Sequence, residues 1–78
     1  MSHPVSFIRA ALAEASDAQE WYEAEAAGLG VRFRSELDDV VERIASNPRQ
    51  FPVVYKDLRR ALLRRFPYAL IFVIEPDE

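Results

Sequence analysis

The stretch "RRALLRRFPYALIFVIEPDE", Arg59–Glu78, decides the fold of this chain. Its first half carries four arginines, its second half is an apolar run, and Pro67 lies between them. The alternation of side chains predicts a strand over residues 59–66, a turn at Pro67 and a second strand over residues 68–74. The second strand is apolar on both faces, which is typical of a strand in the middle of a sheet.

The residues before this hairpin predict a short strand followed by two helices. Residues 5–8, "VSFI", are β-branched and aromatic, and they favour a strand. Helical periodicity begins at Ala10 and ends at Gly28, and a second amphipathic pattern runs to "SNP" at 46–48, where the proline stops it. Two amphipathic helices joined by so few residues should form an antiparallel hairpin. The segment 49–58 reads as a loop or an irregular strand.

The predicted element order is β-α-α-β-β, in a single domain over residues 1–78. This order favours an α+β fold in which the helical hairpin packs on one face of a small antiparallel sheet. Nothing follows the strand 68–74 that could serve as its second neighbour. We therefore expect that a last strand is missing after Glu78, or that another chain supplies it.

Composition argues against several kinds of site. The 78 residues include no cysteine and one histidine, His3, so disulfides and thiolate metal sites are excluded and a conventional zinc site is not expected. We predict no metal and no cofactor. No stretch has the pattern of a signal peptide or a membrane span, and the lack of cysteine suits a reducing compartment. We expect a cytoplasmic protein with no membrane partner.

Charge is divided unevenly along the chain. Residues 1–48 hold four basic and nine acidic side chains, a balance of −5, whereas residues 49–74 hold six basic and one acidic side chain, a balance of +5. The last four residues, "EPDE", add three acids. The basic part should attract an acidic protein or a nucleic acid.

The arginine cluster allows two interpretations. Arg59, Arg60, Arg64 and Arg65 can solvate the exposed face of an edge strand and so discourage aggregation. They can also bind acidic groups of a partner, because the planar guanidinium makes bidentate bonds to carboxylates and phosphates. A nucleic-acid site is less favoured, since no exposed aromatic run accompanies the arginines to stack bases.

Two adjacent aromatics on the first helix also allow two interpretations. Large aromatic side chains usually bury in the core, which is the favoured reading for Trp21 and Tyr22. The alternative is a docking surface for a partner helix in the groove of the hairpin.

In the order and spacing of these elements the chain resembles the RelE/ParE superfamily of toxins from bacterial type II toxin–antitoxin systems, nearer its ParE-like branch. Three stretches carry the resemblance. "EWYEAEAAGLGVRFRSELDDVVERIASNP" is similar to the family's helical hairpin, "NPRQFPVV" to its linker, and "RRALLRRFPYALIFVIEPDE" to its strand–FPY–strand hairpin. The resemblance extends from Val5 to Glu78.

Two departures from the family pattern bear on enzymatic activity. Family members usually continue with a final strand, where this sequence has none. Nuclease members carry a basic residue directly after the aromatic that opens the third strand, and a lysine on the preceding strand, where this chain has Ala69 and Leu62. A metal-free ribonuclease also needs a general base, and none is evident. We therefore predict no catalytic residue, and we favour binding over enzymatic activity without excluding the latter.

The resemblance implies a toxin that binds a ParD-like antitoxin in a hetero-oligomer and inhibits growth through DNA gyrase. The alternatives are a ribosome-dependent mRNA endonuclease like the RelE branch, or a truncated, non-toxic remnant that retains antitoxin binding. The residues assigned to antitoxin binding lie on both helices and in the arginine cluster: Trp21, Tyr22, Phe33, Leu37, Arg59, Arg60, Arg64 and Arg65.

Overall fold

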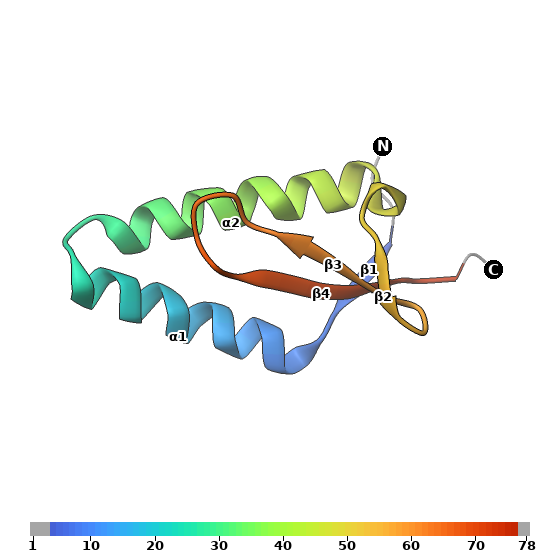
Figure 1. Ribbon diagram of the computed structural model, residues 1–78, viewed down its shortest axis with the longest axis horizontal. Helices are drawn as coiled ribbons and strands as arrows, with labels where there is room; N and C mark the ends of the chain where they lie inside the picture. The colour runs from blue at the N-terminus through green and yellow to red at the C-terminus, as the bar shows by residue number, and fades with distance from the viewer. Residues whose placement is uncertain (1–3, 77–78) are drawn as a thin grey trace.

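The computed structural model describes residues 4–76, which form two helices and a four-stranded antiparallel sheet (Figure 1). The elements are, in order, β1 Val5–Phe7, α1 Arg9–Glu25, α2 Leu29–Ser46, the 3₁₀ helix Pro48–Gln50, β2 Val53–Tyr55, β3 Leu58–Leu62 and β4 Ala69–Ile74. The predicted α+β class and helical hairpin are confirmed, and β2 is an additional strand. His3 lies outside the described residues.

The sheet has the strand order β1-β4-β3-β2, so β4 is central, as predicted. The expectation of a missing second neighbour for β4 is wrong. The first strand of the chain fills that position, with Val5 opposite Ile74 and Phe7 opposite Phe72. Pairing between the two ends of the chain leaves no local signal, which is why the sequence pattern did not reveal it.

The arginine-bearing strand β3 lies inside the sheet, and the interpretation of it as an edge strand is therefore wrong. The segment predicted as a loop or irregular strand contains β2, which pairs with β3 through a register shift between Val53 and Tyr55. β3 also ends at Leu62, four residues earlier than predicted. A turn follows it, closed by the backbone N–H of Leu63, which donates to the carbonyl of Tyr68 at 3.0 Å.

Two glycines shape the connection between the helices. Gly28 has a φ of 88°, a left-handed conformation that glycine adopts without steric penalty. The carboxylate of Glu23 accepts hydrogen bonds from the N–H groups of Gly28 and Gly30, both at 2.9 Å. A residue near the end of α1 thereby satisfies two backbone donors at the start of α2, which the helix itself leaves unpaired. Figure 1 shows this connection at one end of the molecule, opposite β1 and β2.

The core lies between α2 and one face of the sheet. The buried face of α2 follows helical spacing and is formed by Phe33, Leu37, Val40 and Ile44. These side chains belong to one buried cluster with Ala61 of β3 and with Leu70 and Phe72 of β4. Phe33 is fully buried and Leu37 is 6% exposed, so two residues assigned to antitoxin binding are core residues in this fold.

An aromatic cluster joins α1, α2 and the turn after β3. The ring of Tyr22 lies 5.2 Å from that of Phe33 and 4.7 Å from that of Phe66, and the Phe33 ring lies 5.1 Å from that of Tyr68. Tyr22 is half-buried, in keeping with the favoured interpretation. Trp21 is 59% exposed, so its favoured interpretation as a core residue is wrong. The ring of Trp21 instead lies edge-on to that of Tyr22, with centroids 5.1 Å apart.

Replacing Gly30 by alanine tests the close approach of the helices. A Cβ atom at Gly30 would lie 2.8 Å from the carbonyl oxygen of Gln19 and 2.9 Å from the Cβ of Glu23. We expect Gly30→Ala to lower the free energy of unfolding by about 1–3 kcal/mol, because overpacking forces the helices apart. Denaturant unfolding measures this, with the exposed Val31→Ala as the control, which should change stability by about 0.5 kcal/mol or less. A gain of about 1 kcal/mol for Gly30→Ala, as helix propensity alone predicts, would contradict the account.

Candidate binding surface

The two central strands present opposite faces to different surroundings. Side chains alternate along a strand, and residues directly opposite one another on neighbouring strands share a face. Ala61 lies opposite Leu70 on the buried face. On the other face Arg60 lies opposite Ile71, and Leu62 opposite Ala69. We call this second surface the outer sheet face, formed by Leu58, Arg60, Leu62, Ala69, Ile71 and Val73.

The outer sheet face is mainly apolar and is not part of the core. None of its six residues belongs to the buried cluster or to the partly buried side chains packed against that cluster. Leu62 is 58% exposed, and Ile71 and Val73 are partly exposed. Tyr55 of β2 lies opposite Leu58 and is 63% exposed, so it extends the surface to the edge of the sheet. An apolar surface with Leu62 and Tyr55 exposed and its other apolar residues half-buried is typical of an interaction surface.

One cation lies within this apolar surface. Arg60 is exposed, and its guanidinium forms no ion pair with a carboxylate of residues 4–76. A charge-assisted hydrogen bond that Arg60 donates to a partner carboxylate would fix the orientation of an apolar segment laid across the sheet.

The other three arginines of the predicted cluster do not lie on this surface. Arg64 and Arg65 belong to the turn between β3 and β4, where their backbone N–H groups donate to the carboxylate of Glu36 on α2, at 3.0 Å for Arg65. The backbone of this turn is thereby hydrogen-bonded to α2. Arg64 and Arg65 also line a hollow together with Arg32 and Glu36. The predicted cluster is thus divided among three places in the fold.

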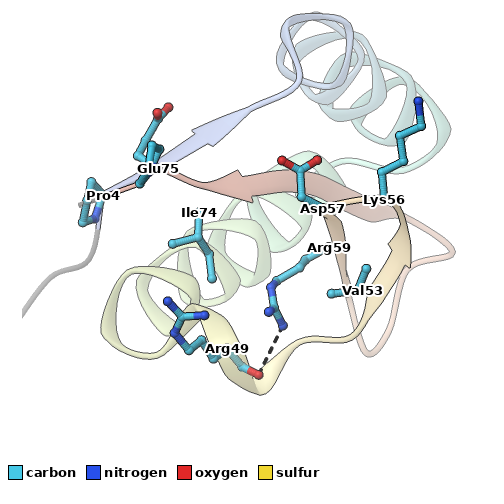
Figure 2. Close-up of a pocket in the computed structure, with 9 residues that line it drawn as sticks. Pro4, Arg49, Val53, Lys56, Asp57, Arg59, Ile74 and Glu75 are labelled. Carbon is cyan, nitrogen blue, oxygen red and sulfur yellow. Dashed lines mark hydrogen bonds between the residues drawn. The ribbon is translucent and has the colours of Figure 1, made fainter. Parts of the chain in front are cut away.

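Arg59 lies on the buried face of the sheet, at the end of the core. It is half-buried opposite Phe72, and its Nη1 donates to the carbonyl of Phe51 at 2.7 Å and to that of Arg49 at 3.4 Å. Figure 2 shows the bond to Arg49 and the hollow that the two arginines share. These bonds hold the 3₁₀ segment against β3, which gives Arg59 a structural role that sequence reasoning missed.

The two positions that the sequence resemblance matches to cations of nuclease members are neighbours in space. Leu62 and Ala69 are directly opposite one another on the outer sheet face, so apolar side chains occupy both. The pKa of Tyr68 is raised above 10.0 by burial and, to a smaller extent, by the charge of Glu14, so its phenol holds its proton. Among residues 4–76 no three histidine, aspartate or glutamate side chains gather closely enough to hold a metal ion.

Comparison with protein-family models, with curated proteins and with solved structures found no match to this chain. Within the described part of the chain, neither helix has the length and apolar character needed to cross a bilayer. The fold and the geometry of its surfaces are therefore the observations on which a function is proposed.

Two features of these surfaces have no counterpart in the sequence pattern. Glu36 reaches a turn 28 residues further along the chain, and helical periodicity marked it only as part of a polar face. Arg49 reaches the hollow beside Arg59 from the 3₁₀ segment, which was expected to be a loop or an irregular strand. Both contacts depend on how the turns pack, which alternation and periodicity do not encode.

The raised pKa of Tyr68 predicts a dependence of stability on alkaline pH. Because the neutral phenol is favoured in the folded state, its contribution is complete below pH 10 and is lost as the pH rises through the higher folded pKa. Between pH 9 and pH 11 the free energy of unfolding should therefore decrease more for the wild type than for Tyr68→Phe. Tyr55→Phe, at an exposed position, is the control and should fall as the wild type does. Equal losses for the wild type and Tyr68→Phe would contradict the assignment.

Proposed function

We propose that this chain acts by binding a protein, as a ParE-like toxin that is neutralised by an acidic, ParD-like antitoxin. The outer sheet face is the observation that carries the proposal. It combines exposed apolar side chains with a single cation, Arg60, within a strand pair that cannot bury this surface itself. A cytoplasmic location and growth inhibition through DNA gyrase belong to the same proposal, on the strength of the sequence resemblance.

The occupant that suits this surface is an amphipathic segment of the antitoxin with an acidic residue among its apolar ones. The apolar residues would cover Leu62, Ile71 and Val73, and the carboxylate would pair with Arg60. Burial of apolar area would supply most of the affinity, at about 25 cal/mol per Å² before the losses of association are subtracted. The charge pair would select the partner and its orientation.

Binding is favoured over RNA cleavage because of what occupies the outer sheet face. Phosphoryl chemistry needs cations arranged around the developing charge. Here the cross-strand pair Leu62 and Ala69 supplies none, and Arg60 alone projects from β3 on that side. The mRNA endonuclease remains the second candidate function only through the sequence resemblance, and the non-toxic, antitoxin-binding remnant is the third.

Expression of the chain with and without its neighbouring open reading frame tests the proposal. We expect slower growth on induction of the chain alone, inhibition of purified gyrase by the chain, and recovery of both when the neighbouring product is present. If the chain binds the neighbouring product but does not slow growth, the result would support the third candidate, the non-toxic remnant that retains antitoxin binding. Cleavage of mRNA in the ribosomal A site would establish the endonuclease instead. Absence of both growth inhibition and binding would contradict all three.

The variant Leu62→Asp tests the surface itself. Because Leu62 is 58% exposed, the substitution should leave the fold intact while placing a charge against the apolar side of the antitoxin. We expect the dissociation constant to rise about tenfold or more, as for the loss of a central apolar contact. Val31→Asp, on α2 at 68% exposure, is the matched control and should bind as the wild type does. The reverse result, a loss confined to Val31→Asp, would place the antitoxin on the helices.

A further inference from the structure

A pocket separate from the outer sheet face lies on the opposite side of the sheet, at the end of the core beside β2. Its volume is about 370 Å³. Arg49 and Arg59 line it together with the apolar side chains of Val53 and Ile74, and Lys56 lies at its rim. The fold brings the lining residues together from separate parts of the chain: Pro4 before β1, the 3₁₀ helix, β2 and β3 with the turn that joins them, and the end of β4 with the two residues after it.

Two guanidiniums turn toward the same hollow. Figure 2 shows the guanidinium of Arg59 between Ile74 and Val53, and that of Arg49 on the Ile74 side of the same pocket. The position of Arg59 is fixed, because its Nη1 donates to the carbonyls of Phe51 and Arg49. Neither guanidinium forms an ion pair with a carboxylate of residues 4–76. Two cations that line one pocket attract an anion, since its charge reduces their mutual repulsion.

The charges around the pocket favour an anion with a single charge. Asp57 and Glu75 also line it, so its three cations and two carboxylates give a balance of +1. Figure 2 shows both carboxylates directed away from the two guanidiniums, toward the rim. A carboxylate would meet the arginine pair without close repulsion, and the planar fork of arginine suits it. Inorganic phosphate, which is partly dianionic at pH 7, would bring more negative charge than the balance of +1 offsets.

The apolar side of the pocket indicates which chemical group is attached to the carboxylate of the ligand. Val53 is 49% exposed and Ile74 is partly exposed, and both lie beside the arginine pair. An aliphatic stem of two or three carbons can cover these side chains while its carboxylate reaches the guanidiniums. We propose that Arg49 and Arg59 bind the carboxylate of a ligand with a short aliphatic stem, either a free acid or the glutamate side chain of a peptide. This site does not depend on the toxin proposal.

Nuclear magnetic resonance titration of the whole chain tests the site. The probes are propionate, the peptide acetyl-Ala-Glu-Ala-amide and inorganic phosphate, each added at constant ionic strength and pH 7. We expect propionate or the peptide to shift the Nε–H signals of Arg49 and Arg59 saturably, and phosphate to bind more weakly. The tighter of the two carboxylate probes identifies the source of the ligand, a free acid or a peptide.

The variant Arg49→Gln removes one guanidinium from an exposed side chain without disturbing the bonds made by Arg59. The dissociation constant for the carboxylate probe should rise about tenfold, as for the loss of a charge-assisted hydrogen bond. Arg65→Gln, an exposed arginine in the turn after β3, is the matched control and should leave the titration unchanged. The proposal is overturned by the absence of saturable shifts, by tighter binding of phosphate, or by equal affinity of Arg49→Gln and the wild type.

Discussion

The antiparallel register of β3 and β4 is the constraint on which the rest of this structure depends. Pairing Ala61 with Leu70 directs both side chains into the core, where Phe33 and Ile44 of α2 meet them. The same register directs Arg60, Leu62 and the residues opposite them outward. A shift of one residue would exchange the two faces, burying a guanidinium and exposing core side chains, so the register is strongly specified. The hydrogen bonds that the turn after β3 donates from its backbone to Glu36 of α2 support this register.

The register also explains why four arginines close together in the sequence serve different purposes in the fold. Neighbours along a strand point to opposite faces, so Arg59 closes the end of the core while Arg60 lies within the outer sheet face. Arg64 and Arg65 lie beyond the strand, in the turn. The basic half of the sequence therefore forms three separate surfaces rather than one basic patch, and this favours pairing with individual carboxylates over following a nucleic-acid backbone.

Much of the fold could be predicted from local patterns, and the errors have a common cause. Helical spacing of Phe33, Leu37 and Ile44 predicted the buried face of α2, and the continuous apolar run 68–74 predicted a central strand. The partner of that strand was missed because β1 lies more than sixty residues earlier in the chain. The prediction that Trp21 lies in the core was wrong because its helical position is only adjacent to the buried stripe of α1. Tertiary packing decides that Tyr22, and not Trp21, contacts Phe66 in the aromatic cluster. Leu62 and Ala69 were singled out in the sequence only as positions without a basic side chain, so the outer sheet face was not predicted, and the arginine pocket needed the turns to be placed first.

The central claim is that the uncovered, apolar face of the sheet is the surface that a partner covers. Methyl resonances report this directly, because Leu62, Ile71 and Val73 lie on the outer face while Leu70 lies in the core between them in sequence. With a soluble paramagnetic agent in the buffer, binding of the proposed antitoxin should remove the line broadening of the three outer residues and leave Leu70 unaffected. Persistent broadening of Leu62, Ile71 and Val73 in the complex, with protection of Val31 and Val41 on α2 instead, would contradict the account.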